Sequence, residues 1–245
     1  MSLTICVPAL NESQSIEKNL KSLISFCKEY ISDYEIVFID DGSTDNTYDQ
    51  ASMLLRKKDL CLKKNKNEGL AAAYKTAIEH ARKEFFILFP SDNGWNPHDL
   101  LQIYNQREKA DIIIPYLIRM NDKSRMRKIL SRLYVLIINI LFHENIKYYN
   151  GIVLHKTKNL KEMKCFSNSF AYQTEYLLKM VKVLNKSYHQ MPFSTNKREY
   201  GKSKALKIDN IFKVFHDIKS LFVEIMIKQK LFNNKIIASF FIGPS

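Results

Sequence analysis

Short apolar runs alternate with amphipathic helical patterns along the first half of this chain, and this alternation limits the folds that it can adopt. Four apolar runs have the length of a strand: residues 3–9, 35–40, 84–89 and 110–115. A shorter run lies near Leu60–Leu62. Segments with helical spacing separate these runs. Strands that alternate with helices form a mostly parallel sheet with helices on both faces. The sequence therefore predicts an α/β fold.

The predicted helices carry their apolar residues on one face. Asn11 or Ser13 is expected to cap the first helix, and the second is expected to end near Lys57. The apolar faces of the first and third helices are formed by Ile16, Leu20, Leu23, Ile24 and Cys27, and by Leu70, Ala73, Ala77, Ile78 and Ala81.

Polar side chains cluster directly after three of the predicted strands. The three clusters are Asn11-Glu12, Asp40-Asp41-Gly42-Ser43 and Ser91-Asp92-Asn93. Ligands of such sheets bind beyond the carboxyl ends of the strands. Any one of the clusters could merely cap a helix, but a purely structural sheet does not need all three. We therefore expect a ligand site at this edge.

The net charge of +13 indicates an anionic partner, which is a nucleic acid, an anionic membrane or a phosphorylated substrate. The four cysteines form no Cys-x-x-Cys pair and are expected to be buried reduced thiols, and the six histidines show no metal-ligand spacing. No signal peptide or apolar run of membrane-spanning length is recognised. We expect a cytoplasmic protein, either soluble or peripherally attached to a membrane.

The motifs resemble those of the family-2 glycosyltransferases, and within them the dolichyl-phosphate mannose synthase-like branch. The resemblance covers about residues 3–205. Two segments match the family motifs closely, "VPALNE" (7–12) and "IDDGSTDNT" (39–47), and "YYNGIVLHK" (148–156) matches more loosely. Three others resemble family segments: "NEGLAAA" (67–73), "FAYQTEYLLKM" (170–180) and "REYGKSK" (198–204).

The resemblance implies a GT-A fold, with a glycosyltransferase domain in residues 1–204 and a C-terminal helical extension in 205–245. The nucleotide-binding half is expected in 1–116 and the acceptor half in 117–204. The family also implies a UDP- or GDP-linked sugar donor, Mg²⁺ or Mn²⁺, a polyprenyl or dolichyl phosphate acceptor and inversion at the anomeric carbon. Because Gly-x-Gly-x-x-Gly and Gly-x-x-x-x-Gly-Lys motifs are missing, dehydrogenases and P-loop proteins are disfavoured.

The resemblance also assigns roles to individual residues. Asp40 is expected to accept hydrogen bonds from the base or ribose, and Asp41 to do the same or to orient its loop. Arg198 is expected near the phosphates. Glu175 is expected to contact the sugar, to steer Arg198 or to act as a base for a hydroxyl acceptor. The full nucleotide-binding set is Pro8, Ala9, Asn11, Glu12, Asp40, Asp41, Gly69 and Ser91.

The loop after the fourth strand departs from the Asp-x-Asp pattern of the family. Pro90 replaces the first aspartate, Asp92 keeps the second, and Gly94 stands where mannose synthases often carry glutamine. Mg²⁺ and Mn²⁺ accept one or two carboxylates together with phosphates and waters. We therefore expect Asp92 to bind the cation and to be catalytic, assisted by Asn93 or Ser91.

Residues 119–132 are rich in arginine and lysine, and an apolar run follows them. Arginine forks bind phosphate through two hydrogen bonds, so the acceptor phosphate is expected at Arg119, Arg127, Ser131 and Lys204. The apolar run and the C-terminal extension either lie in a membrane interface or pack on the core. Lys147 replaces an aspartate that many relatives carry before the acceptor motif, which leaves the identity of the acceptor open.

Two other functions remain open. One is transfer to a hydroxyl of a growing glycan, with Glu175 or another carboxylate as the base. The other is a catalytically silent nucleotide-sugar binding protein of a membrane glycan machine, which Pro90 and Gly94 favour. No nucleic-acid-binding module is recognised, so we expect no nucleic acid partner despite the charge. The sequence predicts no oligomeric state.

Overall fold

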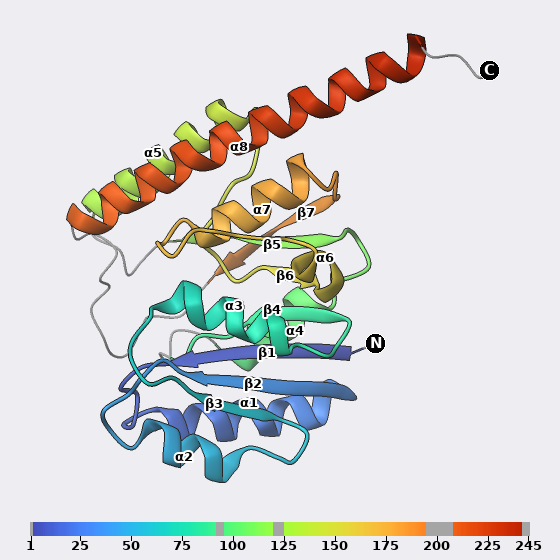
Figure 1. Ribbon diagram of the computed structural model, residues 1–245. Coiled ribbons are helices and arrows are strands. Elements are labelled where there is room, and N and C mark those ends of the chain that lie inside the picture. The colour runs from blue at the N-terminus through green and yellow to red at the C-terminus, as the bar shows by residue number, and fades with distance from the viewer. Residues whose placement is uncertain (1, 92–95, 120–124, 195–207, 242–245) are drawn as a thin grey trace.

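The computed structural model describes residues 2–91, 96–119, 125–194 and 208–241 (Figure 1). Seven strands among these residues form one sheet in the order β3-β2-β1-β4-β6-β5-β7. The neighbours β1–β2, β1–β4, β2–β3 and β5–β7 are parallel, and only β6 runs antiparallel to its neighbours. The predicted α/β fold with a mostly parallel sheet is confirmed.

Strands and helices alternate through the first part of the chain as the sequence predicts. These elements are β1 (Ser2–Ala9), α1 (Ile16–Tyr30), β2 (Asp33–Asp40), α2 (Thr47–Leu54), β3 (Leu60–Lys63), α3 (Leu70–His80) and β4 (Phe85–Leu88). The later elements are α4 (Pro97–Tyr104), β5 (Ile112–Arg119), α5 (Arg125–Phe142), β6 (Leu154–Lys156), α6 (Thr157–Lys161), α7 (Tyr172–Lys182), β7 (Tyr188–Ser194) and α8 (Ile208–Phe241).

The start of α1 differs from the prediction. Ser15, rather than Asn11 or Ser13, precedes the helix, and its side chain makes no cap hydrogen bond. Asn11 has a left-handed backbone (φ 55°), and its side chain instead accepts the backbone N–H of Thr44 at 2.9 Å. The predicted cap was wrong because Asn11 binds the loop after β2 rather than the first turn of the helix.

Two hydrophobic layers cover the sheet, one on each face, because successive strand residues point to opposite sides. Cys6 and Val37 face a layer that includes residues of α3, α5, α7 and α8. Ile5 and Ile36 face a layer built with α1 and α4. All four cysteines are free thiols, of which Cys6 and Cys27 are buried, so the expectation of reduced thiols agrees with the structure.

The helices α5 and α8 lie side by side as an outer layer beyond α7 (Figure 1). Phe142 on α5 and Phe222 on α8 meet edge to face at 5.7 Å between ring centroids. Ile218, Leu221 and Ile225 of α8 are buried against the core. The first half of α8 therefore packs on the core, one of the two arrangements that the sequence left open. Among the described helices none is long and apolar enough to cross a membrane.

Candidate active site

The carboxyl ends of β1, β2 and β4 meet at one edge of the sheet, as the three polar clusters predict. The chain runs from β1 outward through β2 and β3, then returns to β4 on the other side of β1. This reversal is the position at which open α/β sheets bind their ligands. The N–H of Asp41 donates to the Ala9 carbonyl at 2.9 Å, and the N–H of Phe89 donates to the Cys6 carbonyl at 2.8 Å. The strand ends are thus fixed to one another.

Asp40, the last residue of β2, is fully buried and only half satisfied. Its Oδ1 accepts the N–H of Ser43 at 2.8 Å. Its Oδ2 has no hydrogen-bond partner among the described residues. A buried carboxylate oxygen without a partner is costly, and such an atom in a native protein calls for an explanation. A ligand that donates an N–H or O–H to Oδ2 supplies one.

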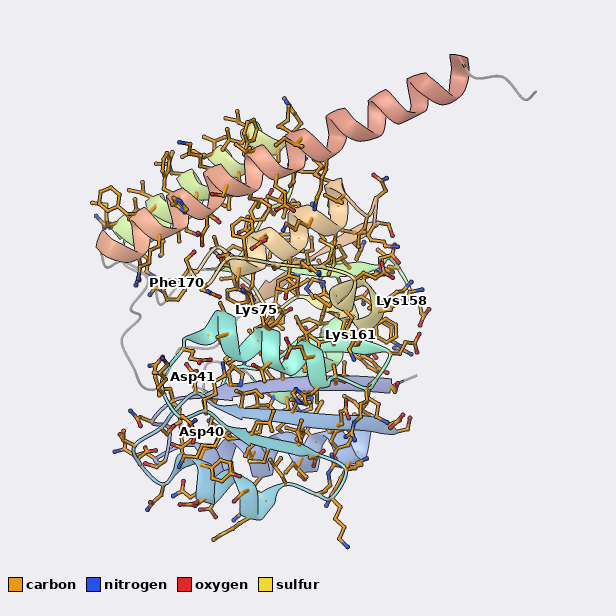
Figure 2. The ribbon with its side chains drawn as sticks, in the orientation of Figure 1. Asp40, Asp41, Lys75, Lys158, Lys161 and Phe170 are labelled. Carbon is orange, nitrogen blue, oxygen red and sulfur yellow. The ribbon has the colours of Figure 1, made fainter. Side chains whose placement is uncertain are left out.

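The neighbouring Asp41 is almost completely buried, but both of its oxygens are occupied. Oδ1 accepts the N–H of Glu68 at 3.1 Å, and Oδ2 accepts the N–H of Gly69 at 2.7 Å. Gly69 has φ +92°, a conformation that favours glycine. Of the two expected roles of Asp41, its observed contacts are those of a residue that orients the loop before α3. Figure 2 shows Asp40 and Asp41 close together on this side of the molecule.

Gly42 allows two loops of the site to approach each other closely. Its φ is +81°, and a Cβ atom at this position would lie 2.5 Å from the backbone carbonyl carbon of Lys66. Both observations require glycine here. The glycine of the "IDDGS" motif therefore brings the turn after β2 against the segment that leads into α3.

The loops after β1 and β2 are tied together by side-chain hydrogen bonds. The backbone N–H of Asn11 donates to Ser43 Oγ at 2.9 Å, and that of Glu12 donates to Thr47 Oγ1 at 2.8 Å. Asp45 accepts the N–H groups of Ser13 and Thr47 at 3.2 and 3.0 Å. Partial burial raises the pKa of Asp45, but hydrogen bonds from the side chains and the backbone N–H groups of Thr47 and Ser13 outweigh it and lower the pKa to about 2.

Ser91 fixes the start of the loop that was assigned to the cation. Its hydroxyl donates to the Pro8 carbonyl at 2.9 Å, and its own carbonyl accepts the Asn19 amide at 2.6 Å. Asp92 and Asn93 lie outside the described residues, as do Arg198 and Lys204. Within the described ranges, no group of three or more His, Cys, Asp or Glu side chains is arranged to hold a metal ion.

Glu175 lies on α7 and is buried in contacts within the protein. Its oxygens accept the N–H groups of Phe166 and Ser167 at 3.0 and 2.8 Å, and Oε1 lies 2.7 Å from Lys179 Nζ. Lys179 also reaches Glu224 on α8 at 2.8 Å. These contacts anchor the loop before α7, and the expected role of Glu175 toward the sugar stays a prediction. Sequence reasoning missed Lys179, whose signal was a Glu–Lys pair four residues apart in an otherwise apolar helix.

Arg119, one of the residues expected at the acceptor phosphate, lies at the same edge of the sheet. Because β6 is antiparallel to both β4 and β5, β5 runs parallel to β1 and ends at Arg119 on that edge. The helix α5 begins six residues later, and its Arg127 and Ser131 are half-buried on the helix face that carries Tyr134. Tyr134 contacts Thr174 of α7 through their hydroxyls at 2.7 Å. The strand β7, parallel to β5, also ends there, four residues before Arg198.

A sequence model of the family described as glycosyl transferase family 2 matches residues 4–177, which is more than half of the chain. Dodecaprenyl-phosphate galacturonate synthase of Rhizobium johnstonii is 24% identical over 233 residues, which cover 90% of this chain and 66% of that protein. Undecaprenyl-phosphate 4-deoxy-4-formamido-L-arabinose transferase of Pseudomonas fluorescens is 23% identical over 220 residues, which cover 82% and 59%. The chain therefore spans only part of the length of these relatives.

Solved structures show the same fold. Glucosyl-3-phosphoglycerate synthase from Mycobacterium tuberculosis, in complex with Mn²⁺, UDP and glucosyl-3-phosphoglycerate, superposes with a TM-score of 0.67 at 16% identity. The match covers 90% of this chain and 79% of that one. The complex of the same enzyme with Mg²⁺ and UDP gives a TM-score of 0.67 at 14% identity. The expected GT-A fold is thereby confirmed.

Proposed function

The chain belongs to glycosyl transferase family 2, and we propose that it transfers a sugar from a nucleoside-diphosphate sugar to a polyprenyl phosphate. The observation that carries the proposal is the unpartnered Oδ2 of the buried Asp40 at the meeting point of three strand ends. The names of two relatives, a dodecaprenyl-phosphate and an undecaprenyl-phosphate sugar transferase, support the acceptor. The UDP in the similar crystal structures supports the donor.

The donor nucleoside lies in the crevice between the carboxyl ends of β1, β2 and β4. Asp40 accepts a hydrogen bond from the base or the ribose. Asn11, Glu12 and Asp41 hold the surrounding loops through contacts already formed in the protein. The backbone at Pro8, Ala9, Gly69 and Ser91 completes the wall. A site preorganised in this way does not spend donor binding energy on ordering its loops.

The acceptor phosphate lies between the end of β5 and the start of α5, where Arg127 and Ser131 share the inner face of the helix. Arg119 and Lys204 complete the phosphate site. A phosphate is already ionised at neutral pH and needs no general base. The occupied oxygens of Glu175 are consistent with such an acceptor.

The transfer is a direct displacement. An acceptor phosphate oxygen attacks the anomeric carbon while the bond from that carbon to the nucleoside diphosphate breaks, which inverts the configuration. The electron pair leaves with the diphosphate, and Arg198 stabilises the charge that develops there.

A divalent cation fits the oxygen-rich chemistry of the loop after β4. Asp92 follows directly on Ser91, which two hydrogen bonds fix to Pro8 at the end of β1 and to Asn19 of α1. Carboxylate, amide and hydroxyl oxygens are the ligands that Mg²⁺ and Mn²⁺ prefer, so Asp92 would hold the ion with help from Asn93 or Ser91. When bound, the ion supplies positive charge beside the diphosphate.

The test is to incubate the purified protein with polyprenyl phosphate and a panel of UDP- and GDP-sugars, with Mn²⁺ or EDTA. Glycolipid is detected by mass spectrometry. We expect a glycolipid product that EDTA abolishes and that the Asp92→Ala variant does not form. Asp49→Asn, an exposed change on α2, is the control that keeps activity. Nucleotide binding without any glycolipid would overturn the proposal and favour a glycan hydroxyl acceptor or a silent binding protein.

A further inference from the structure

Exposed hydrophobic side chains are concentrated on the outer layer formed by α5 and α8. Of the nineteen exposed large hydrophobic side chains among the described residues, eight lie on α5 and five on α8. The exposed fraction reaches 63% at Met126 and Ile140, and 71% at Phe215. Monomeric soluble proteins rarely expose contiguous apolar patches of more than a few hundred Å². This layer therefore calls for a partner that covers it.

The apolar stripe of α5 points away from the protein. Its exposed members recur three or four residues apart, which places them on one side of the helix: Met126, Ile129, Leu130, Leu133, Leu136, Ile137, Ile140 and Leu141. The opposite side of α5 packs on the body through Tyr134, Ile138 and Phe142. The helix thus has one apolar side in the core and a second that its own fold leaves uncovered.

The charges of the outer layer are positive. The sequence of α5 contains no acidic residue, and its four basic residues all lie between Arg125 and Arg132. The two acidic residues of α8 with described side chains already have partners, because Asp217 accepts the Ser167 hydroxyl at 2.6 Å and Glu224 pairs with both Lys179 and Lys228. Apolar side chains flanked by lysine and arginine complement an anionic lipid surface.

We infer that the outer layer of α5 and α8 docks on an anionic lipid bilayer, with its apolar side chains at the level of the headgroups and upper acyl chains. The inference deepens the proposed function and rests on it, because a polyprenyl phosphate is reached at such a surface. The basic start of α5 follows β5 at the edge where the candidate site lies. A docked layer therefore brings that edge to the headgroups, where the acceptor phosphate lies.

Sedimentation with vesicles tests the inference without requiring activity. The full chain is mixed with vesicles of phosphatidylglycerol and phosphatidylethanolamine, or with vesicles of phosphatidylcholine alone. We expect binding to the anionic vesicles that is at least tenfold stronger and that weakens as salt is raised. The double variant Ile129→Glu/Ile140→Glu is expected to lose this binding at least tenfold. Met53→Glu, on α2 and 84% exposed, is the matched control that keeps it.

A second pair of variants tests the contribution of charge. Arg125→Glu/Lys128→Glu is expected to weaken binding to anionic vesicles several-fold. Lys57→Glu, at an exposed lysine three residues after α2, is expected to change it little, because α2 lies at the opposite end of the molecule from α5 (Figure 1). Equal binding to neutral and anionic vesicles would overturn the inference. It would also be overturned if wild-type protein ignored both vesicles but formed a dimer that Ile129→Glu/Ile140→Glu dissociates in light scattering, since the layer would then join two copies of the chain.

A failure of the docking inference can be distinguished from a failure of the proposed transferase function. With a short, water-soluble prenyl phosphate and no vesicles, Ile129→Glu/Ile140→Glu is expected to keep the transferase rate of the wild type. Vesicle binding without transfer to either acceptor would remove the proposed function and leave the docking surface. Transfer without vesicle binding would remove the docking surface alone.

Discussion

The two adjacent aspartates at the end of β2 differ in how their carboxylate oxygens are hydrogen-bonded. Both carboxylate oxygens of Asp41 accept backbone N–H groups, whereas the buried Oδ2 of Asp40 has no hydrogen-bond partner among the described residues. The partners of Asp41 come from residues 68 and 69, which lie 27 and 28 positions further along the chain. The motif therefore predicts the place of both carboxylates, but only the tertiary structure separates the one that holds the loop from the one left for a ligand.

Replacing Asp40 by asparagine is expected to separate binding from stability. A hydrogen bond to a charged group contributes roughly 1.5–3 kcal/mol, so nucleotide affinity should fall about 10- to 100-fold. The free protein should not lose stability, because the change removes a buried charge while an oxygen remains to accept the Ser43 N–H. Calorimetric titration with UDP and GDP, paired with thermal melts, measures both effects. Unchanged affinity, with Asp49→Asn as control, would mean that Oδ2 meets no ligand.

His155 on β6 is expected to make the protein acid-sensitive. Its side chain is buried, and burial lowers its pKa from the ordinary value to about 3. The unfolded chain takes up a proton below about pH 6.5, whereas the folded chain does so only near pH 3. Stability is therefore fully present above about pH 6.5 and is lost as the pH falls toward 3.

Urea unfolding at pH 6.5 and 5 measures this effect. The free energy of unfolding should fall with pH by up to about 1.4 kcal/mol per pH unit more in wild type than in His155→Leu. The exposed His80→Gln serves as the reference and should keep the wild-type slope. Parallel slopes for wild type and His155→Leu would show that His155 does not titrate in this way.

At the scale of elements, helical spacing predicted α1, α2, α3, α5 and α8 and the buried faces of α1 and α3, but it did not decide which sides of α5 and α8 face the core. Both α5 and α8 carry apolar residues on more than one side, and periodicity alone cannot tell a core contact from an exposed face. The sequence also did not predict the buried ion-pair cluster on α7. Its Lys179 is 2% exposed, and the Nζ atom lies within 2.8 Å of carboxylate oxygens of both Glu175 and Glu224. Burial of a lysine depends on partners from elsewhere in the chain, which a local pattern does not contain.

Replacing Lys179 by methionine is expected to loosen α8 from the core. Breaking a buried ion pair by removing one partner costs roughly 3–5 kcal/mol, because the remaining charge stays buried without compensation. Chemical denaturation should show this loss, and Lys158→Met, at an exposed position on α6, should be nearly neutral. The triple variant with Glu175→Gln and Glu224→Gln should recover part of the stability. A neutral Lys179→Met would show that the cluster does not hold α8.

For the whole molecule, the sequence predicted β1 to β5 in their order along the chain, the mostly parallel sheet and the edge at which the polar clusters meet, but it did not predict the strands β6 and β7. These features follow from local periodicity and from the rule that ligands bind at the carboxyl ends of parallel strands. It did not predict that β6 inserts antiparallel between β4 and β5, since a local pattern does not show with which distant strand a segment pairs. That insertion places the end of β5 at the same edge of the sheet as the ends of β1, β2 and β4.

The central claim is that the donor lies at Asp40 and the acceptor phosphate at the start of α5. Steady-state kinetics, with the sugar donor that the panel identifies, tests both parts at once. Asp40→Asn should raise the KM for the donor at least tenfold and leave that for polyprenyl phosphate unchanged. Arg127→Gln should raise the KM for polyprenyl phosphate and leave that for the donor unchanged, because it removes a charged hydrogen-bond donor from the phosphate site. If both variants raised the same KM, or neither raised any, the two sites would not lie where we place them.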